Sequence, residues 1–258
     1  MATESSFILP TTPLTVADNP FPTIAPGAQE SRRWTAYAKL LRNRIGANLN
    51  RMALERTDFT VISNDCWGQA LYEELGLRSC SPLIGSGMHA ECFLRFLGDI
   101  PGYLAAPLRF ISTSRYGSVN RIRNRRGGWP MAALGDGIEI HFLHYRTEEE
   151  SRRSWEEGCR RVNLDRLVVK FTVDKDGASP KHIAMFDRLP FERKLLLSAH
   201  PHPEIGCAVH VPDYVYNGAM MFRRSLRHFD CGRWLNTGEI QRNTLRVLVN
   251  KALYARGA

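Results

Sequence analysis

The sequence has no long apolar run and no closely spaced pair of cysteines. Nowhere does it approach the ~18 consecutive apolar residues of a membrane-spanning helix. Residues 1–7 lack the basic start and long apolar core of a signal peptide. The six cysteines form no Cys-x-x-Cys pair, and their wide spacing suits neither a zinc ribbon nor a disulfide framework. We therefore expect a cytoplasmic protein with reduced cysteines, no metal and no cofactor.

Acidic residues are also in short supply. Lys and Arg number 35 against 26 Asp and Glu, which gives a net charge of +9. This charge favours anionic partners such as nucleotide-linked sugars or an anionic membrane surface. The 258 residues are 43% hydrophobic and 24% charged, values typical of a globular protein and unlike those of a collagen or a wholly disordered chain.

Three regions follow one another along the chain. Residues 1–30 hold five of the 14 prolines, which predicts a disordered arm. Residues 31–56 carry apolar side chains every three or four positions with arginines between them, which predicts a basic amphipathic helix. That helix either packs on the domain through its apolar face or rests on anionic lipid at the inner membrane. Residues 57–258 are expected to form a single α/β domain.

Strand-like and helix-like segments alternate through this domain. Such alternation is typical of a mostly parallel sheet with flanking helices, a Rossmann-like three-layer fold, here with helical additions at both ends. The strands are expected at 59–63, 82–84, 138–145, 167–173 and 194–198, and the principal helices at 66–75, 89–97, 147–161, 179–190 and near 245–253.

Cys66 occupies the most informative position. Asn64 and Asp65, which are residue types that begin helices, separate it from the strand before it. The thiol is therefore expected in the first turn of a helix, where the N-terminus favours a thiolate, at the sheet edge where ligands gather. The alternative is that Cys66 is a small buried residue with no chemical role.

A nucleophilic cysteine needs a base, and the segment 138–145 offers two histidines on opposite faces. His144 lies at its carboxyl end and is our candidate base, whereas His141 is expected in the core. A carboxylate that orients the imidazole is expected at another strand end, at Asp176 or at Asp174. A solvated turn explains either aspartate equally well.

Six arginines lie between positions 109 and 126 without a nearby acid in the sequence. Planar guanidinium groups suit phosphate, so we assign Arg115, Arg121 and Arg123 to the binding of a nucleotide- or lipid-linked sugar, with a solvated loop as the alternative. No nucleic-acid-binding motif accompanies them, so nucleic acid is not the expected partner. Gly85 to Ala90 fits a dinucleotide-binding pattern, but its context favours ordinary loop glycines.

Residues 59–77, FTVISNDCWGQALYEELGL, resemble the opening motif of a bacterial family of unknown function described as exopolysaccharide biosynthesis proteins. That motif resembles ISNNCWGG, so Asp65 replaces its second Asn and Gln69 its second Gly. Further similarity at 135–145, 186–190 and 234–236 extends the resemblance over about residues 57 to 236. It implies a role in making or decorating a cell-surface polysaccharide.

The resemblance brings no assigned catalytic residues. Together with Cys66 and His144, it favours transfer of an acyl-type group to a glycan precursor through a thioester. We assign Asn64, Asp65, Trp67 and Gly68 to the substrate side of this site, with the N–H groups of Trp67 and Gly68 holding the oxyanion. The alternative is a glycosyltransferase-like or noncatalytic protein that binds a sugar nucleotide or glycan through the arginine-rich segment.

Overall fold

The computed structural model describes residues 26–254, and within them the side chains of Tyr37 and of residues 40–254. The described residues from Leu40 onward belong to one compact unit, and the earlier ones belong to a separate unit. Most of the arm expected over residues 1–30 lies outside the described residues. Helix α1 (Pro26–Met52) begins before residue 30, where the arm was expected to end. No described helix is both long and apolar enough to cross a membrane.

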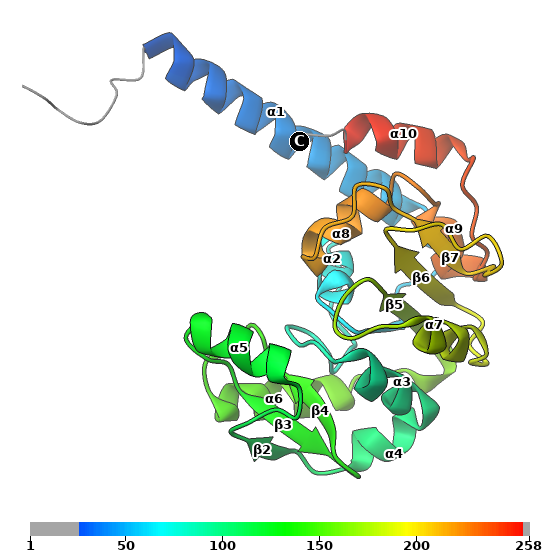
Figure 1. The fold of residues 1–258 in the computed structure, drawn as a ribbon. Coiled ribbons are helices and arrows are strands. Elements are labelled where there is room, and N and C mark those ends of the chain that lie inside the picture. The colour runs from blue at the N-terminus through cyan, green and yellow to red at the C-terminus, as the bar shows by residue number, and fades with distance from the viewer. Residues whose placement is uncertain (1–25, 255–258) are drawn as a thin grey trace, which may run out of the picture. The chain divides into compact units, whose positions relative to one another are not determined.

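Four parallel strands form the main sheet (Figure 1). Their order is β1-β5-β6-β7, and they are β1 (Thr60–Ser63), β5 (Leu167–Thr172), β6 (Lys194–Ser198) and β7 (Ala208–His210). The apolar runs that predicted three of them are buried on both sides, as parallel strands require. The expected α/β fold with a mostly parallel sheet is confirmed.

Helices cover both faces of this sheet. The sheet divides the apolar core into two clusters, one on each face. Val168 of β5 packs on one side with α2 (Trp67–Glu74), α8 (Gly218–Ser225) and α9 (Cys231–Thr237). Val169 and Phe171 point the other way, toward α3 (Ala90–Gly98), α6 (Glu148–Cys159) and α7 (Pro180–Asp187). The period of two along a strand accounts for this division.

A second, antiparallel sheet corrects part of the sequence analysis. It consists of β2 (Arg109–Ile111), β3 (Met131–Leu134) and β4 (Ile138–His141). The strand expected over 138–145 therefore stops at His141 and lies outside the main sheet. Residues 82–84 form a turn rather than a strand. The arginine-rich segment is not a loop, because it contains β2 and the helix α5 (Gly117–Arg125).

The remaining elements connect these layers or extend them. They are α4 (Ile100–Ala105), the 3₁₀ helix η1 (Leu164–Arg166) and α10 (Leu245–Leu253). With α1 before the main sheet and α10 after it, the expected helical additions are present at both ends. A bridge between Gly87 and His141 joins the segment before α3 to β4. This bridge brings the turn after β4 close to the carboxyl end of β1.

Candidate functional site

The segment that follows β1 is fixed by buried side chains. Asn64 accepts a hydrogen bond from the N–H of Thr172 at 2.9 Å and donates one to its carbonyl at 3.0 Å. These bonds continue the pairing of β1 with β5 beyond the last residue of β1. Because Asn64 is fully buried and both ends of its amide are used, it is a structural residue and not the substrate ligand that we expected.

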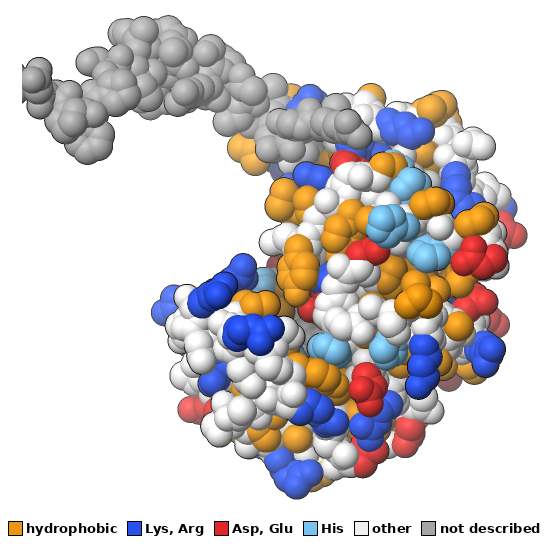
Figure 2. Space-filling view, in the orientation of Figure 1, with side chains coloured by type: hydrophobic (Ala, Val, Ile, Leu, Met, Phe, Trp, Pro, Cys, Tyr) orange, Lys and Arg blue, Asp and Glu red, His pale blue; other side chains and the backbone are white. Residues whose placement is uncertain are grey.

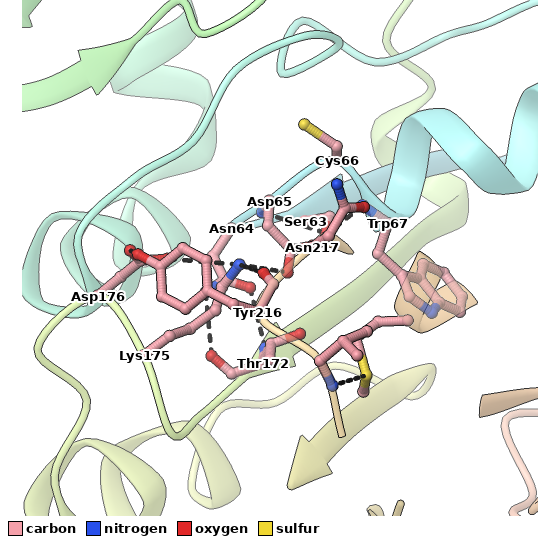
Figure 3. Close-up of polar contacts among 12 residues, drawn as sticks. Ser63, Asn64, Asp65, Cys66, Trp67, Thr172, Lys175, Asp176, Tyr216 and Asn217 are labelled. Atoms are coloured by element: carbon pink, nitrogen blue, oxygen red, sulfur yellow. Dashed lines mark hydrogen bonds and ion pairs between the residues drawn. The ribbon is translucent and has the colours of Figure 1, made fainter. Parts of the chain in front are cut away.

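Asp65 is the centre of a buried ion-pair network (Figure 3). One carboxylate oxygen lies 2.5 Å from Nζ of Lys170, and the other lies 2.9 Å from Nζ of Lys175. The two ammonium groups hold the pKa of Asp65 well below its usual range, although burial alone would raise it. Asp65 therefore stays ionised beneath the site, and its assignment to substrate binding is wrong.

The same carboxylate accepts a hydrogen bond from the backbone N–H of Trp67 at 3.0 Å. This N–H is consequently not available to an oxyanion, which corrects our expectation for Trp67. Its indole is fully buried and donates to Oγ of Ser225 at 3.1 Å. Gly68 packs so closely on β1 that an added Cβ would lie 3.1 Å from a methyl carbon of Val61. Gly68 therefore packs against the core on the side where a side chain would stand.

Cys66 and His144 meet at the surface of this framework. Sγ of Cys66 lies 3.2 Å from Nε2 of His144, 78 positions further along the chain. Cys66 immediately precedes α2 and is partly exposed, and His144 is exposed in the turn after β4. Figure 3 shows the sulfur pointing away from the buried network below it. The structure thus brings together the thiol and the imidazole that we expected to act as nucleophile and base.

Two successive hydrogen bonds connect His144 to α2. The His144 N–H donates to the carbonyl of Gly85 at 3.0 Å, and the Gly85 N–H donates to Oε1 of Gln69 at 3.0 Å. Gly85 has φ +66°, and an added Cβ would lie 2.8 Å from the ring of Tyr145, so glycine is required there. Gln69, which stands where the resembled motif has glycine, therefore helps to position the histidine.

The glycines around position 85 do not form a phosphate cradle. Several backbone N–H groups of this segment already donate within the protein, and their acceptors are the side chain of Gln69 and the carbonyls of Leu83, His141, Asn64 and Asp176. A phosphate-binding loop needs such groups free. The interpretation of these residues as loop glycines agrees with this arrangement.

The environment of Cys66 keeps its thiol protonated. Burial and, next, the negative charge of Asp65 raise the pKa of Cys66 to about 11, and the positive charges of Lys175 and Lys170 oppose this rise. The first N–H of α2 is paired with the Asp65 carboxylate, so this helix start does not supply the stabilisation of a thiolate that we expected from it. A neutral thiol beside an imidazole nitrogen remains competent, because the histidine can take the proton as the sulfur attacks.

Asp176 does not orient His144. It accepts a hydrogen bond from the hydroxyl of Tyr216 at 2.7 Å and lies 3.6 Å from Nζ of Lys175. Asp174, the alternative, accepts from the N–H of Ala199 at 2.8 Å. Within residues 40–254, no carboxylate hydrogen-bonds to His144. The described site is therefore a pair of catalytic candidates, without the third member that we expected.

The arginine-rich segment is less uniform than its sequence predicts. Glu139 accepts hydrogen bonds from both the N–H and Nε of Arg115, so that arginine has a counter-charge. Arg123 donates to the carbonyls of Trp129 and Ser112. Both side chains therefore have partners within the protein, although the Arg115 side chain is still 43% exposed, and their assignment to substrate binding stays a prediction. Arg121 is exposed on α5 and keeps that assignment as a prediction.

A hollow separates α5 from the segment that leads into α8. Figure 2 shows it between the Lys and Arg side chains gathered on α5 and the part of the chain that carries α8. Tyr216 of that segment is 58% exposed, and its ring lies 5.0 Å from Nζ of Lys175. The positive charge of Arg126, at the end of α5, lowers the pKa of Tyr216, which burial and Asp176 raise to about 12. Arg126 thus lies within electrostatic reach of this ring.

Sequence reasoning missed the roles of five residues that shape the site: Gln69, Lys170, Lys175, Tyr216 and Asn217. Lys170 could have been recognised, because a lone lysine in the apolar run Val168–Phe171 needs a buried counter-charge. The other four lie in a helix or in loops, where the sequence indicates no partner. His141 is buried with Nε2 3.4 Å from Glu139, in agreement with a core role.

No cluster of three or more potential metal ligands occurs among the described residues.

Comparison with known proteins identifies the family. Residues 36–236 match the family described as domain of unknown function DUF1919. The chain belongs to this family. The DUF1919 match spans Cys66 and His144. An uncharacterised protein of Haemophilus influenzae is similar, with 30% identity over 196 residues that cover 76% of this chain and 84% of that protein.

Proposed function

We propose that the protein is a cysteine-dependent acyltransferase that modifies a glycan precursor for a cell-surface polysaccharide. The observation that carries this proposal is the 3.2 Å contact between Sγ of Cys66 and Nε2 of His144 at the carboxyl edge of a parallel sheet. In open α/β sheets this edge is where ligands bind. The polysaccharide context rests on the resemblance of residues 59–77 to exopolysaccharide biosynthesis proteins.

The reaction takes two steps. Sγ attacks the carbonyl carbon of an acyl ester or thioester while Nε2 of His144 accepts the thiol proton. The tetrahedral intermediate collapses to a thioester on Cys66, and His144 returns the proton to the departing oxygen or sulfur. A sugar hydroxyl then attacks the thioester and gives its proton to His144, which protonates Sγ as the ester product leaves.

Asn217 supplies a donor for the oxyanion. Figure 3 shows its side chain beside Cys66. Its Oδ1 accepts from the N–H of Met220 at 3.0 Å and so caps α8, which leaves the amide nitrogen to donate. This nitrogen takes the place of the Trp67 N–H, which is paired with Asp65, and the N–H of Gly68 stays the second donor of the proposed pair. The exposed ring of Tyr216 provides an apolar surface on which a sugar can pack.

Acylation of Cys66 tests the proposal. Incubation with p-nitrophenyl acetate should give one acetyl group on Cys66, removable by hydroxylamine and detected by mass spectrometry of the intact protein and its peptides. The Cys66→Ser variant should lose this adduct, whereas Cys80→Ser should keep it. N-acetylglucosamine should then speed the loss of the adduct and appear O-acetylated. Equal labelling of Cys66 and Cys80 would contradict a nucleophilic role.

Asn217→Ser should slow acetylation of Cys66 about a hundredfold without unfolding the protein. Serine keeps an oxygen that caps α8 but removes the amide donor, and one oxyanion donor contributes about 10² to 10³ in rate. The matched control is Asn236→Ser, because Asn236 is also an amide that bonds to backbone, at Glu55 and Ala53, away from Cys66. Equal rates in Asn217→Ser and the unmodified protein would exclude this donor.

A second candidate function rests on the exposed arginines of α5. Arg121 and Arg125 are exposed on α5, exposed Arg126 directly follows them, and guanidinium groups suit the diphosphate of a sugar nucleotide. A glycosyltransferase-like or noncatalytic protein would bind UDP-glucose there and retain binding when Cys66 is replaced by serine. The acyltransferase proposal predicts instead that Cys66→Ser removes the covalent adduct.

A further inference from the structure

Helix α1 presents an apolar stripe to solvent. Leu41, Ile45, Leu49 and Met52 recur at intervals of four, four and three residues, so they lie along one side of the helix. Their exposed fractions are 50%, 43%, 40% and 82%. Large apolar side chains in such a continuous row mark an interaction surface, whereas isolated ones are ordinary.

The opposite side of α1 holds the helix on the domain. Gly46 is buried against Tyr254, whose hydroxyl would lie 2.6 Å from an added Cβ. Asn50 is buried and accepts and donates hydrogen bonds with Asn250 of α10. The domain therefore packs on the small and polar side of α1. Of the two alternatives that the sequence left open, packing through the apolar side is wrong.

Positive charge lines both edges of the stripe. At 100° per residue, Arg44 and Arg51 fall on one side of Leu41–Met52 and Arg42 on the other. None of these three arginines is in an ion pair with the residues that the structure describes. Arg51 bonds only to the carbonyls of Leu75 and Gly76, which leaves its charge uncompensated. Over its whole length α1 contains six basic residues and one acidic residue.

We propose that the stripe Leu41–Met52 docks the protein on an anionic lipid bilayer. An amphipathic helix with apolar residues on one side and arginines at its edges lies in the interface of such a membrane. The aliphatic part of the exposed Arg44 extends along the apolar surface while its charged end reaches the phosphates, and Arg42 and Arg51 add positive charge near them. This surface is distinct from the Cys66 site, and the proposal stands independently of the proposed function.

The charge pattern favours lipid over a second copy of the chain. Helices that pair through an apolar stripe carry opposite charges at the edges of that stripe. Here the charged residues at both edges are arginines, so two copies facing each other would bring like charges together. Each basic residue near an anionic membrane surface instead raises the affinity of the protein for that membrane about fivefold.

Vesicle sedimentation with the full chain tests this inference. We expect binding to vesicles of equal parts phosphatidylcholine and phosphatidylglycerol, weak binding to phosphatidylcholine alone, and release by high salt. Ile45→Glu with Leu49→Glu should lower the partition coefficient at least tenfold, and Arg44→Gln about fivefold. The matched control is Leu164→Glu, because Leu164 is a 47% exposed leucine remote from α1 in sequence.

Light scattering completes the test. Equal partition of the unmodified protein and the double variant would overturn the proposal, as would equal binding to both kinds of vesicle. A dimer in solution that the double variant dissociates, without anionic-lipid binding, would assign the stripe to a second copy and overturn it as well. Circular dichroism of each variant establishes that the fold is retained.

Discussion

Replacing His144 by alanine should slow alkylation of Cys66 by iodoacetamide about a hundredfold at neutral pH and leave the rate in strong alkali almost unchanged. The pKa of Cys66 is raised to about 11, so at neutral pH nearly every molecule carries the neutral thiol. Its reaction then depends on Nε2 of His144, 3.2 Å away, to accept the proton. Above the pKa the thiolate forms by itself and needs no base.

The rate should be measured at Cys66 by peptide mass spectrometry across the alkaline range. His200→Ala is the matched control, because His200 is a 76% exposed histidine whose nearest carboxylate is Asp174. Slowing by the same factor at every pH would indicate that His144 acts only on packing. A rate profile with an apparent pKa well below the ~8.5 of a free thiol would show a thiolate paired with imidazolium and contradict the neutral-thiol mechanism.

The main sheet could be predicted because its strands carry local signals. The runs that became β1, β5 and β6 are apolar on both sides and bounded by turn residues, so pattern alone identified them. In the second sheet, β2 was missed because three residues give too few positions for alternation to be recognised. The four residues of β3, Met-Ala-Ala-Leu, lack the β-branched residues that identified β1, which is equally short.

The pairing of Cys66 with His144 was predicted from an incorrect placement of His144 in the fold. We placed His144 at the end of a strand in the parallel sheet, whereas it follows β4 of the antiparallel sheet. The contact with Cys66 depends on Gly87 bridging to His141 and on Gly85 accepting from His144. These are non-local backbone contacts, and no local pattern in the sequence specifies them.

The polar residues near Cys66 show the limit of reading chemistry from position. Asn64 and Asp65 are helix-start types at a strand end, and we therefore assigned them to substrate. In the structure Asn64 continues the β1–β5 pairing, and Asp65 neutralises Lys170, which lies 105 positions away. The sequence places such residues at the correct edge of the sheet, but only tertiary contacts decide whether they face a ligand or the core.

Asp65→Asn should destabilise the fold by about 3–5 kcal/mol, the cost of leaving buried charge without its partner. Lys170 is fully buried and the side chain of Lys175 is 4% exposed, so neither ammonium group can recover full hydration. Burial already lowers the pKa of Lys170 to about 8, although Asp65 opposes that change. Lys170→Met should cost less, because Asp65 retains Lys175 at 2.9 Å.

Urea unfolding of both variants at neutral pH would establish this order, with Asp136→Asn as the control at the exposed Arg95–Asp136 pair. Because the pKa of Asp65 is lowered in the folded protein, its ion pairs stabilise the fold above the ordinary pKa of ~3.9 and lose their effect as the pH falls below it. The difference between Asp65→Asn and the unmodified protein should therefore shrink in acid. A larger loss for Lys170→Met than for Asp65→Asn would mean that Lys170 stabilises this edge by packing on Trp67, whose ring lies 5.8 Å from its Nζ, more than by its charge.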